Sequence, residues 1–158
     1  MALDSCLKLG DVKGESQVKG FEEQIQVLAW SWGMQQTGTT HLGAGGGAGR
    51  VSVNDLSFTH YVDAATPRLI GACCTGKHYE AGTLVVRKAG GDPFPYLTIK
   101  LNDLHITSVS LGSSAGEERQ TENVTLNFAS FELSYQPQDD KGAKGEAITV
   151  TYDIRRNI

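Results

Sequence analysis

The sequence has little cysteine, and its three cysteines lack the spacing of any thiol site. Cys73 and Cys74 are adjacent and Cys6 lies far from both, so the chain contains neither a CxxC nor a CxxxC pair. This absence excludes a zinc clip and a thiol–disulfide redox motif. We expect all three cysteines to be reduced and packed in the core.

Long apolar runs and basic clusters are also missing. No stretch approaches the ~18 apolar residues of a membrane-spanning helix, and the N-terminal residues lack the basic and apolar regions of a secretory signal. The 14 Lys and Arg residues are scattered and the formal net charge is −4, which argues against a nucleic-acid or anionic membrane partner. We expect a chain folded in the cytoplasm, with no nucleic acid partner and no membrane insertion.

Motifs for catalysis are equally scarce. The four histidines stand far apart, without an HExxH pair (His41, His60, His78, His105). Residues 112–116 match GxSxG around Ser114, but the motif requires a following helix, and here a polar stretch leads into another strand. We therefore predict a hairpin tip, no catalytic or metal-binding residues and no cofactor. A hydrolase centred on Ser114 remains as an alternative.

Glycine, in contrast, is abundant, with 19 residues and a run from Gly43 to Gly49. Part of the run fits GxGxxA, but a strand begins at Val51 where a nucleotide-binding motif needs a helix, and no P-loop lysine follows. The run lies within Gln35–Arg50, a segment with little apolar pattern. Loops of this length are usually functional or disordered, so we predict a long glycine-rich loop that is either flexible or ordered by a partner.

Most of the remaining chain alternates in the way of β-strands. Leu3–Leu9 predicts a half-buried strand. Ile25–Trp32 is apolar on both faces, with Leu28, Trp30 and Trp32 on one and Ile25, Val27 and Ala29 on the other. We therefore expect both faces to be covered, either within the domain or by a neighbouring chain. Further strands are expected at Leu84–Lys88, Tyr96–Leu101 and Ala147–Ile154.

Three strands change the parity of their apolar residues partway along. The changes fall near Asn54, between Ile106 and Val109, and between Phe128 and Phe131. Each indicates a β-bulge, and repeated bulges let a sheet curl into a barrel. The fold class is therefore mainly β: a small antiparallel, bulged β-barrel.

One segment favours a helix, from about Pro67 to Thr75. Thr66 can cap it, Pro67 suits its first turn and Gly76 suits the residue after its last turn. Helical spacing places four residues on one side, facing the barrel (Leu69, Ile70, Cys73, Cys74). Because no linker interrupts the composition, we expect residues 1–158 to form a single domain.

The long loop and the two-faced tryptophan strand suggest contact between copies of the chain. Eight segments along the chain are recognisable: residues 7–16 (LKLGDVKGES), 25–33 (IQVLAWSWG), 53–59 (VNDLSFT), 66–73 (TPRLIGAC), 76–79 (GKHY), 87–91 (RKAGG), 122–129 (ENVTLNFA) and 135–138 (YQPQ). In these segments and their order the chain resembles the haemolysin-coregulated protein (Hcp) family, the inner-tube subunits of bacterial type VI secretion systems.

The resemblance implies a barrel that forms homohexameric rings, which stack into a tube. A contractile sheath drives the tube, tipped by a VgrG spike, from the baseplate out of the cell, and effector proteins ride in the ring lumen. It also implies assembly in the cytoplasm, secretion without a signal peptide and, since the chain stops after the final strand, no C-terminal effector extension. A monomeric ligand-binding β-barrel is the other alternative.

The resemblance further suggests which residues face neighbouring molecules. The loop after the tryptophan strand would reach the adjacent ring, and its candidate stacking residues are Met34, His41, Leu42, Gly43, Gly45, Gly46, Gly47 and Gly49. Glycines there would let two backbones approach closely. We also expect Ala29 and Ser31 to face the lumen while Trp30 and Trp32 point into the barrel.

Overall fold

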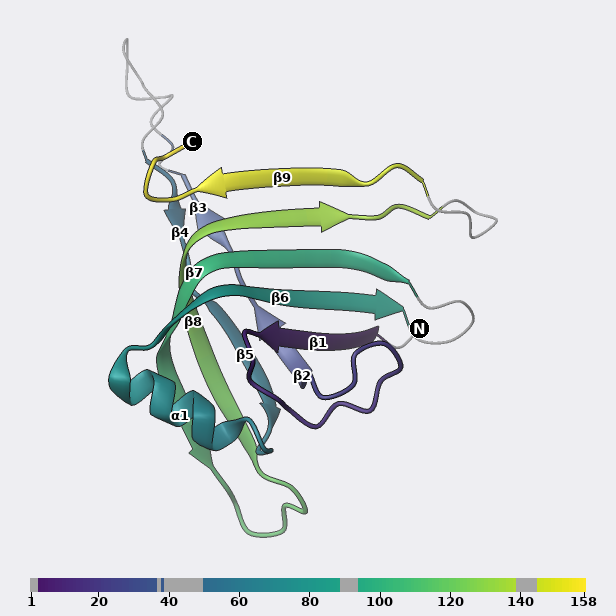
Figure 1. Cartoon of the computed structure of the whole chain (residues 1–158), viewed down its shortest axis with the longest axis vertical. Coiled ribbons are helices and arrows are strands. Elements are labelled where there is room, and N and C mark those ends of the chain that lie inside the picture. Colours follow the sequence, from purple (N-terminus) through teal and green to yellow (C-terminus); the bar gives the residue numbers. More distant parts are fainter. Residues whose placement is uncertain (1–2, 37, 39–49, 89–93, 139–144) are drawn as a thin grey trace.

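The computed structural model describes residues 3–36, 38, 50–88, 94–138 and 145–158 (Figure 1). Its elements, in chain order, are β1 (Leu3–Leu9), β2 (Ile25–Ser31), β3 (Met34–Gln35), β4 (Ser52–Val53), β5 (Leu56–Tyr61), α1 (Thr66–Thr75), β6 (His78–Lys88), β7 (Pro95–Gly112), β8 (Thr121–Tyr135) and β9 (Ile148–Asp153).

Six strands close into an antiparallel barrel in the order β5-β2-β1-β6-β7-β8, and pairing of β5 with β8 completes the circle. The long strand β8 changes its neighbour along its length. Residues 121–126 pair with β5, whereas residues 130–135 pair with β9. The predicted antiparallel barrel is thus confirmed, and β9 is added to it as an outer strand.

The upper halves of β7 and β8 extend beyond the closed barrel. Figure 1 shows β6, β7, β8 and β9 running side by side across the top of the view, while the lower halves of β7 and β8 turn downward past α1. The turn coincides with Asp103, whose φ of 51° is left-handed. The molecule therefore combines a barrel with a sheet that projects from it.

Apolar side chains fill the barrel. The largest fully buried ones are Phe58, Leu7, Leu9, Ile25, Leu56, Leu69, Leu84, Ile99, Leu101, Leu104 and Leu126. Trp30 and Trp32 pack against this core, as predicted. The ring of Trp32 meets that of Phe131 edge-on at 4.8 Å between centroids, and its indole Nε1 donates to the carbonyl oxygen of Asn54 at 2.9 Å.

Within the domain, β2 does not have two covered apolar faces. The pairing of β2 with β5 shifts register between Val27 and Ala29, which is a bulge. Because the bulge reverses parity, Val27 and Trp30 both face the core, whereas Leu28 is 45% exposed. The two apparent apolar faces are one face interrupted by a bulge.

Of the three predicted bulges, one is confirmed. The pairing of β7 with β8 shifts between Ile106 and Ser108. At Phe128 and Phe131 there is no register shift, because β7 changes parity at the same level as β8, at Asp103. Near Asn54 the chain breaks into two strands: β4 pairs with β3 and β5 pairs with β2.

The predicted helix is confirmed as α1, and Gly76 ends it in a left-handed conformation with φ 68°. The predicted cap is wrong. Ala65 occupies the N-cap position without a side-chain bond, because the Thr66 hydroxyl instead contacts Glu122, to which it donates at 3.2 Å. No helix within the described ranges is long and apolar enough to cross a membrane.

The cysteines differ in their surroundings. Cys6 is buried, and burial raises the pKa of its thiol above the ordinary value. Cys73 is half-buried on α1, while Cys74 is exposed because it lies beyond the narrow stripe of the helix that faces the barrel. All three are free thiols. The expectation of three core cysteines is therefore correct for Cys6 and wrong for Cys74.

Candidate self-assembly surfaces

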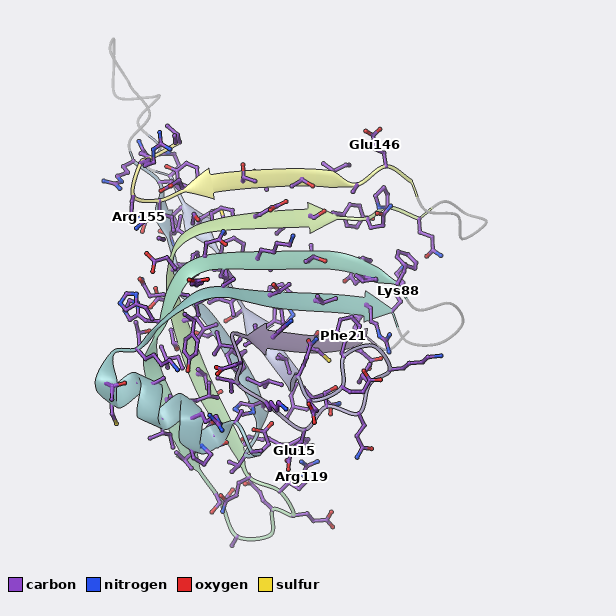
Figure 2. The ribbon with its side chains drawn as sticks, viewed as in Figure 1. Glu15, Phe21, Lys88, Arg119, Glu146 and Arg155 are labelled. Atoms are coloured by element: carbon purple, nitrogen blue, oxygen red, sulfur yellow. The ribbon has the colours of Figure 1, made fainter. Side chains whose placement is uncertain are left out.

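Strand β9 forms the outer edge of the projecting sheet. It pairs with β8 alone among the described strands, so its other edge presents backbone groups that a further strand could pair with. Figure 2 places Glu146 and Arg155 beyond the two ends of the strand. An unpartnered edge of this kind is a natural site for joining a second chain.

The apolar face of this projecting sheet continues the core face of the barrel. Cross-strand pairs carry it from Ile99, which is buried, to Leu133 on β8 and then to Val150 on β9. Exposure rises along the way, so that Val150 is 53% exposed and Ile148 is 66% exposed. A row of apolar side chains is thus partly covered by the barrel and partly left in solvent. We call Tyr135, Ile148 and Val150 the apolar edge.

Part of the outward face of the closed barrel, across β2, β5, β8 and β7, carries small and uncharged side chains. Cross-strand pairing aligns two rows across β2, β5, β8 and β7. We call them the polar rows: Ala29, Thr59, Asn123 and Ser110 form one, and Ser31, Ser57, Thr125 and Ser108 the other. Thr59 donates to Asn123 at 2.5 Å, and the hydroxyls of Ser57 and Thr125 lie 3.3 Å apart.

The polar rows contain both residues that the sequence proposed for the lumen. Ala29 and Ser31 are exposed, and the bulge in β2 places them opposite the inward-facing Trp30. The structure therefore brings them together on one open surface.

Of the candidate stacking residues, Met34 alone lies within the described residues. Met34 lies on β3 and is 45% exposed. His41, Leu42, Gly43, Gly45, Gly46, Gly47 and Gly49 lie outside the described residues. The two-stranded ribbon of β3 and β4 flanks this segment. It leaves the barrel where β2 ends and β5 begins (Figure 1).

Ser114 lies in the exposed connection between β7 and β8, and no helix follows it. Its hydroxyl donates to the carboxylate of Glu117 at 3.0 Å, and its backbone N–H points at the same side chain. Among the hydrogen bonds of the described residues, none joins Ser114 to a histidine. The contact with Glu117 shapes a hairpin tip.

The three histidines that the structure describes occupy two separate environments. The rings of His78 and His105 stack at 4.8 Å on neighbouring strands, with Asp103 and Arg155 alongside. His60 is buried inside the barrel. In the part of the chain that is described, no three His, Cys, Asp or Glu side chains are arranged to hold a metal ion.

Sequence analysis missed a buried polar group around His60. Its Nε2 lies 2.6 Å from a carboxylate oxygen of Glu122, and Asp63 lies on the other side of the ring. Burial opposes the charge of His60, but the hydrogen bond to Glu122 and the nearby carboxylates of Asp63 and Glu122 outweigh it and raise the pKa of the imidazole. The clue was parity: His60 and Glu122 each continue an inward-facing apolar series.

One open depression lies between the loop before β2 and the β7–β8 hairpin, where Figure 2 shows Glu15 and Arg119 close together. It is lined by Gly14, Glu15, Ser16, Gln17, Glu23, Gln26 and Arg119. Ligand sites are usually enclosed and largely apolar. This depression is neither, so the surfaces that stand out are the apolar edge and the polar rows.

Comparison with known proteins supplies the context for these surfaces. The family profile described as "Type VI secretion system effector, Hcp" matches residues 6–135. The chain is similar to "Protein hcp1" of Pseudomonas aeruginosa, with 54% identity over 160 residues that cover 100% of this chain and 99% of that protein.

Solved structures agree. A crystal structure of Hcp1 from Salmonella typhimurium is 37% identical with a TM-score of 0.81, and covers 99% of this chain and 98% of that one. A type VI secretion effector from Yersinia pestis is 33% identical with a TM-score of 0.77, over 95% and 99% of the two chains. A third structure, of a type six secretion system protein, has a TM-score of 0.93 at 26% identity, over 99% of both chains.

Proposed function

Because the chain belongs to the Hcp family of type VI secretion proteins, we propose that it is a subunit that closes into hexameric rings through β9. As a member of this family it is a secreted tube protein. The rings would stack to form that tube. Six copies and a wide lumen follow from the resemblance to the family.

The apolar edge is the observation that supports ring formation. Ile148 and Val150 remain more than half exposed beside an unpaired strand edge. A second copy that pairs with this edge would satisfy its backbone groups and remove these side chains from water, at roughly 25 cal/mol for each Å² of apolar surface buried. Oligomers use such edges because one contact then combines hydrogen bonds with burial.

The polar rows, which begin at Ala29 and Ser31 on β2, are proposed as part of the lumen wall. A flat surface of small, uncharged side chains places no bulky group in the path of cargo, which suits the carriage of effector proteins. A cysteine at position 31 in intact rings tests the position. A large maleimide should react slowly and a small one quickly; equal reaction rates would place position 31 on the outer wall.

Stacking is assigned to Met34, His41, Leu42 and the glycines between Gly43 and Gly49. Its support is the exposed Met34 on a ribbon that projects from the barrel. Deletion of residues 43–49 should abolish tubes and leave rings, as seen by electron microscopy. Long stacks formed by the deletion variant would refute this role.

A tube of this kind would have further partners: a VgrG spike at its tip, a contractile sheath and baseplate around it, and effectors inside. Assembly would take place in the cytoplasm, followed by export through the apparatus. Accumulation of the chain in the medium should then require a contractile sheath. Equal secretion by cells with a sheath that cannot contract would contradict this route.

We further propose that the chain is not an enzyme. Ser114 donates to Glu117 on an exposed hairpin, and among the described residues no histidine contacts it as the base of a serine hydrolase would. A lipocalin-type ligand site is disfavoured too, since apolar side chains fill the barrel. Ser114→Ala should leave secretion and assembly unchanged, and esterase activity abolished by this substitution would overturn the assignment.

A further inference from the structure

A polar cluster is buried between α1 and the barrel. His60 on β5 and Glu122 on β8 are directly opposite each other in the strand pairing, and both are 0% exposed. The 2.6 Å separation of His60 Nε2 from the Glu122 carboxylate is a short, charge-assisted contact. Such a pair inside an apolar core costs desolvation energy, so it is stable only while its charges remain matched.

The same cluster reaches the start of the helix. Asp63, in the connection from β5 to α1, places a carboxylate oxygen 3.7 Å from His60 Nδ1. Thr66, the first residue of α1, donates its hydroxyl to Glu122 at 3.2 Å and accepts a hydrogen bond from the Asp63 backbone N–H at 3.1 Å. We call His60, Asp63, Thr66 and Glu122 the α1 anchor, because they tie the helix start to two barrel strands.

The α1 anchor is closer to charge balance when His60 is protonated. Two carboxylates face one imidazole, so an imidazolium leaves one excess negative charge and a neutral ring leaves two. The second carboxylate oxygen of Glu122 is buried without a hydrogen bond among the described residues, so nothing else offsets its charge there. Buried like charges repel strongly at low dielectric.

We propose that the α1 anchor is a pH-sensitive device: protonated His60 holds the start of α1 on the barrel, and loss of its proton releases that segment. Release is local because Asp63 and Thr66 precede or begin a short helix, whereas Glu122 lies within the long strand β8. The segment that moves is therefore the connection and the first turn of α1.

The direction of the pH effect follows from the folded and unfolded states. Asp63 and Glu122 raise the pKa of His60 despite burial, and they are the charged groups that face it from the helix connection and from β8. An imidazole pKa raised above its unfolded value of about 6.5 contributes stability that is fully present below that value. The contribution is lost as the pH rises through the folded pKa.

The wild-type protein tests the proposal directly, in its assembled form. Hydrogen–deuterium exchange with mass spectrometry should show the protection factor of peptides spanning residues 63–72 falling about tenfold between about pH 6 and about pH 9. Peptides from β6 and β7 should keep theirs. Exchange of the His60 C2 hydrogen should report a pKa above about 6.5. Constant α1 protection, or a lower His60 pKa, would overturn the proposal.

His60→Gln separates the anchor from other titrating groups. Its amide can still hydrogen-bond but carries no charge, so α1 protection should be low and independent of pH. His78→Gln, which alters an exposed histidine, should behave as wild type. A His60→Gln variant with unchanged pH dependence would refute the role of His60. If that variant fails to fold, the pH dependence of hydrogen–deuterium exchange in the wild-type protein still supports or refutes the proposal.

Discussion

Gly14 lies where the loop before β2 meets the backbone of the strand itself. A Cβ at this position would sit 2.6 Å from the Gln24 carbonyl oxygen and 2.8 Å from the Ile25 Cα. Backbone atoms cannot move aside cheaply, so Gly14→Ala should lower the free energy of unfolding by about 1–3 kcal/mol. Chemical denaturation of the assembly-deficient Val150→Glu background, described below, measures the change.

Gly71 provides the matched control for Gly14. It lies on the exposed side of α1, and a Cβ there would meet nothing within 4 Å. Gly71→Ala should therefore stabilise the protein by about 0.5–1 kcal/mol, since alanine is the better helix former. Equal effects of the two substitutions on the free energy of unfolding would contradict the close backbone approach at Gly14.

The α1 anchor shows what single-residue patterns miss. Alternation alone points His60 inward with Phe58, and Glu122 inward with Val124. Their meeting, however, depends on β5 pairing with β8, whose residues are more than fifty positions apart in the chain. Spacing along the sequence cannot supply that pairing, whereas Asp63, three residues after His60, is a local partner that spacing could have indicated.

The strands and the helix were largely predictable, because hydrophobic periodicity and the Gly and Pro residues at the ends of elements are local features of the sequence. Leu3–Leu9 and the helix after Pro67 fall where the pattern places them. The bulge in β2 was not predictable, since an apolar residue on each face fits two readings: a covered strand or a change of parity. Pairing with β5 selects the second.

Strand β9 carries the element-scale prediction. Val150→Glu adds a charge to the apolar edge, where the side chain is already 53% exposed. Secondary structure should therefore persist, with a change in folding stability of about 0.5 kcal/mol or less. Ring formation should be lost, because a buried unpaired carboxylate is costly at an interface. Size-exclusion chromatography and circular dichroism measure the two effects.

Thr149 offers the control for that substitution. It lies on the same strand but on the opposite face, where its hydroxyl donates to Ser134 at 3.2 Å. Thr149→Glu should leave rings intact if apolar burial drives association. Loss of rings in both variants would mean that any charge on the edge strand blocks pairing, and the apolar edge would lose its special role.

At the scale of the whole molecule, the sequence predicted the family and the barrel class but not the barrel's closure. The matched segments span the chain, and the family profile covers residues 6–135. Closure through β5 and β8, and the projection of β9 from the upper half of β8, arise from non-local pairing. That projection is what leaves the apolar edge open.

The mass of the assembled protein in solution tests the central claim, that this barrel joins copies of itself through β9. Multi-angle light scattering of the purified chain should give six times the chain mass of 17.0 kDa, and Val150→Glu should give a single chain mass. A wild-type protein that remains at one chain mass over a wide range of concentration would contradict the account.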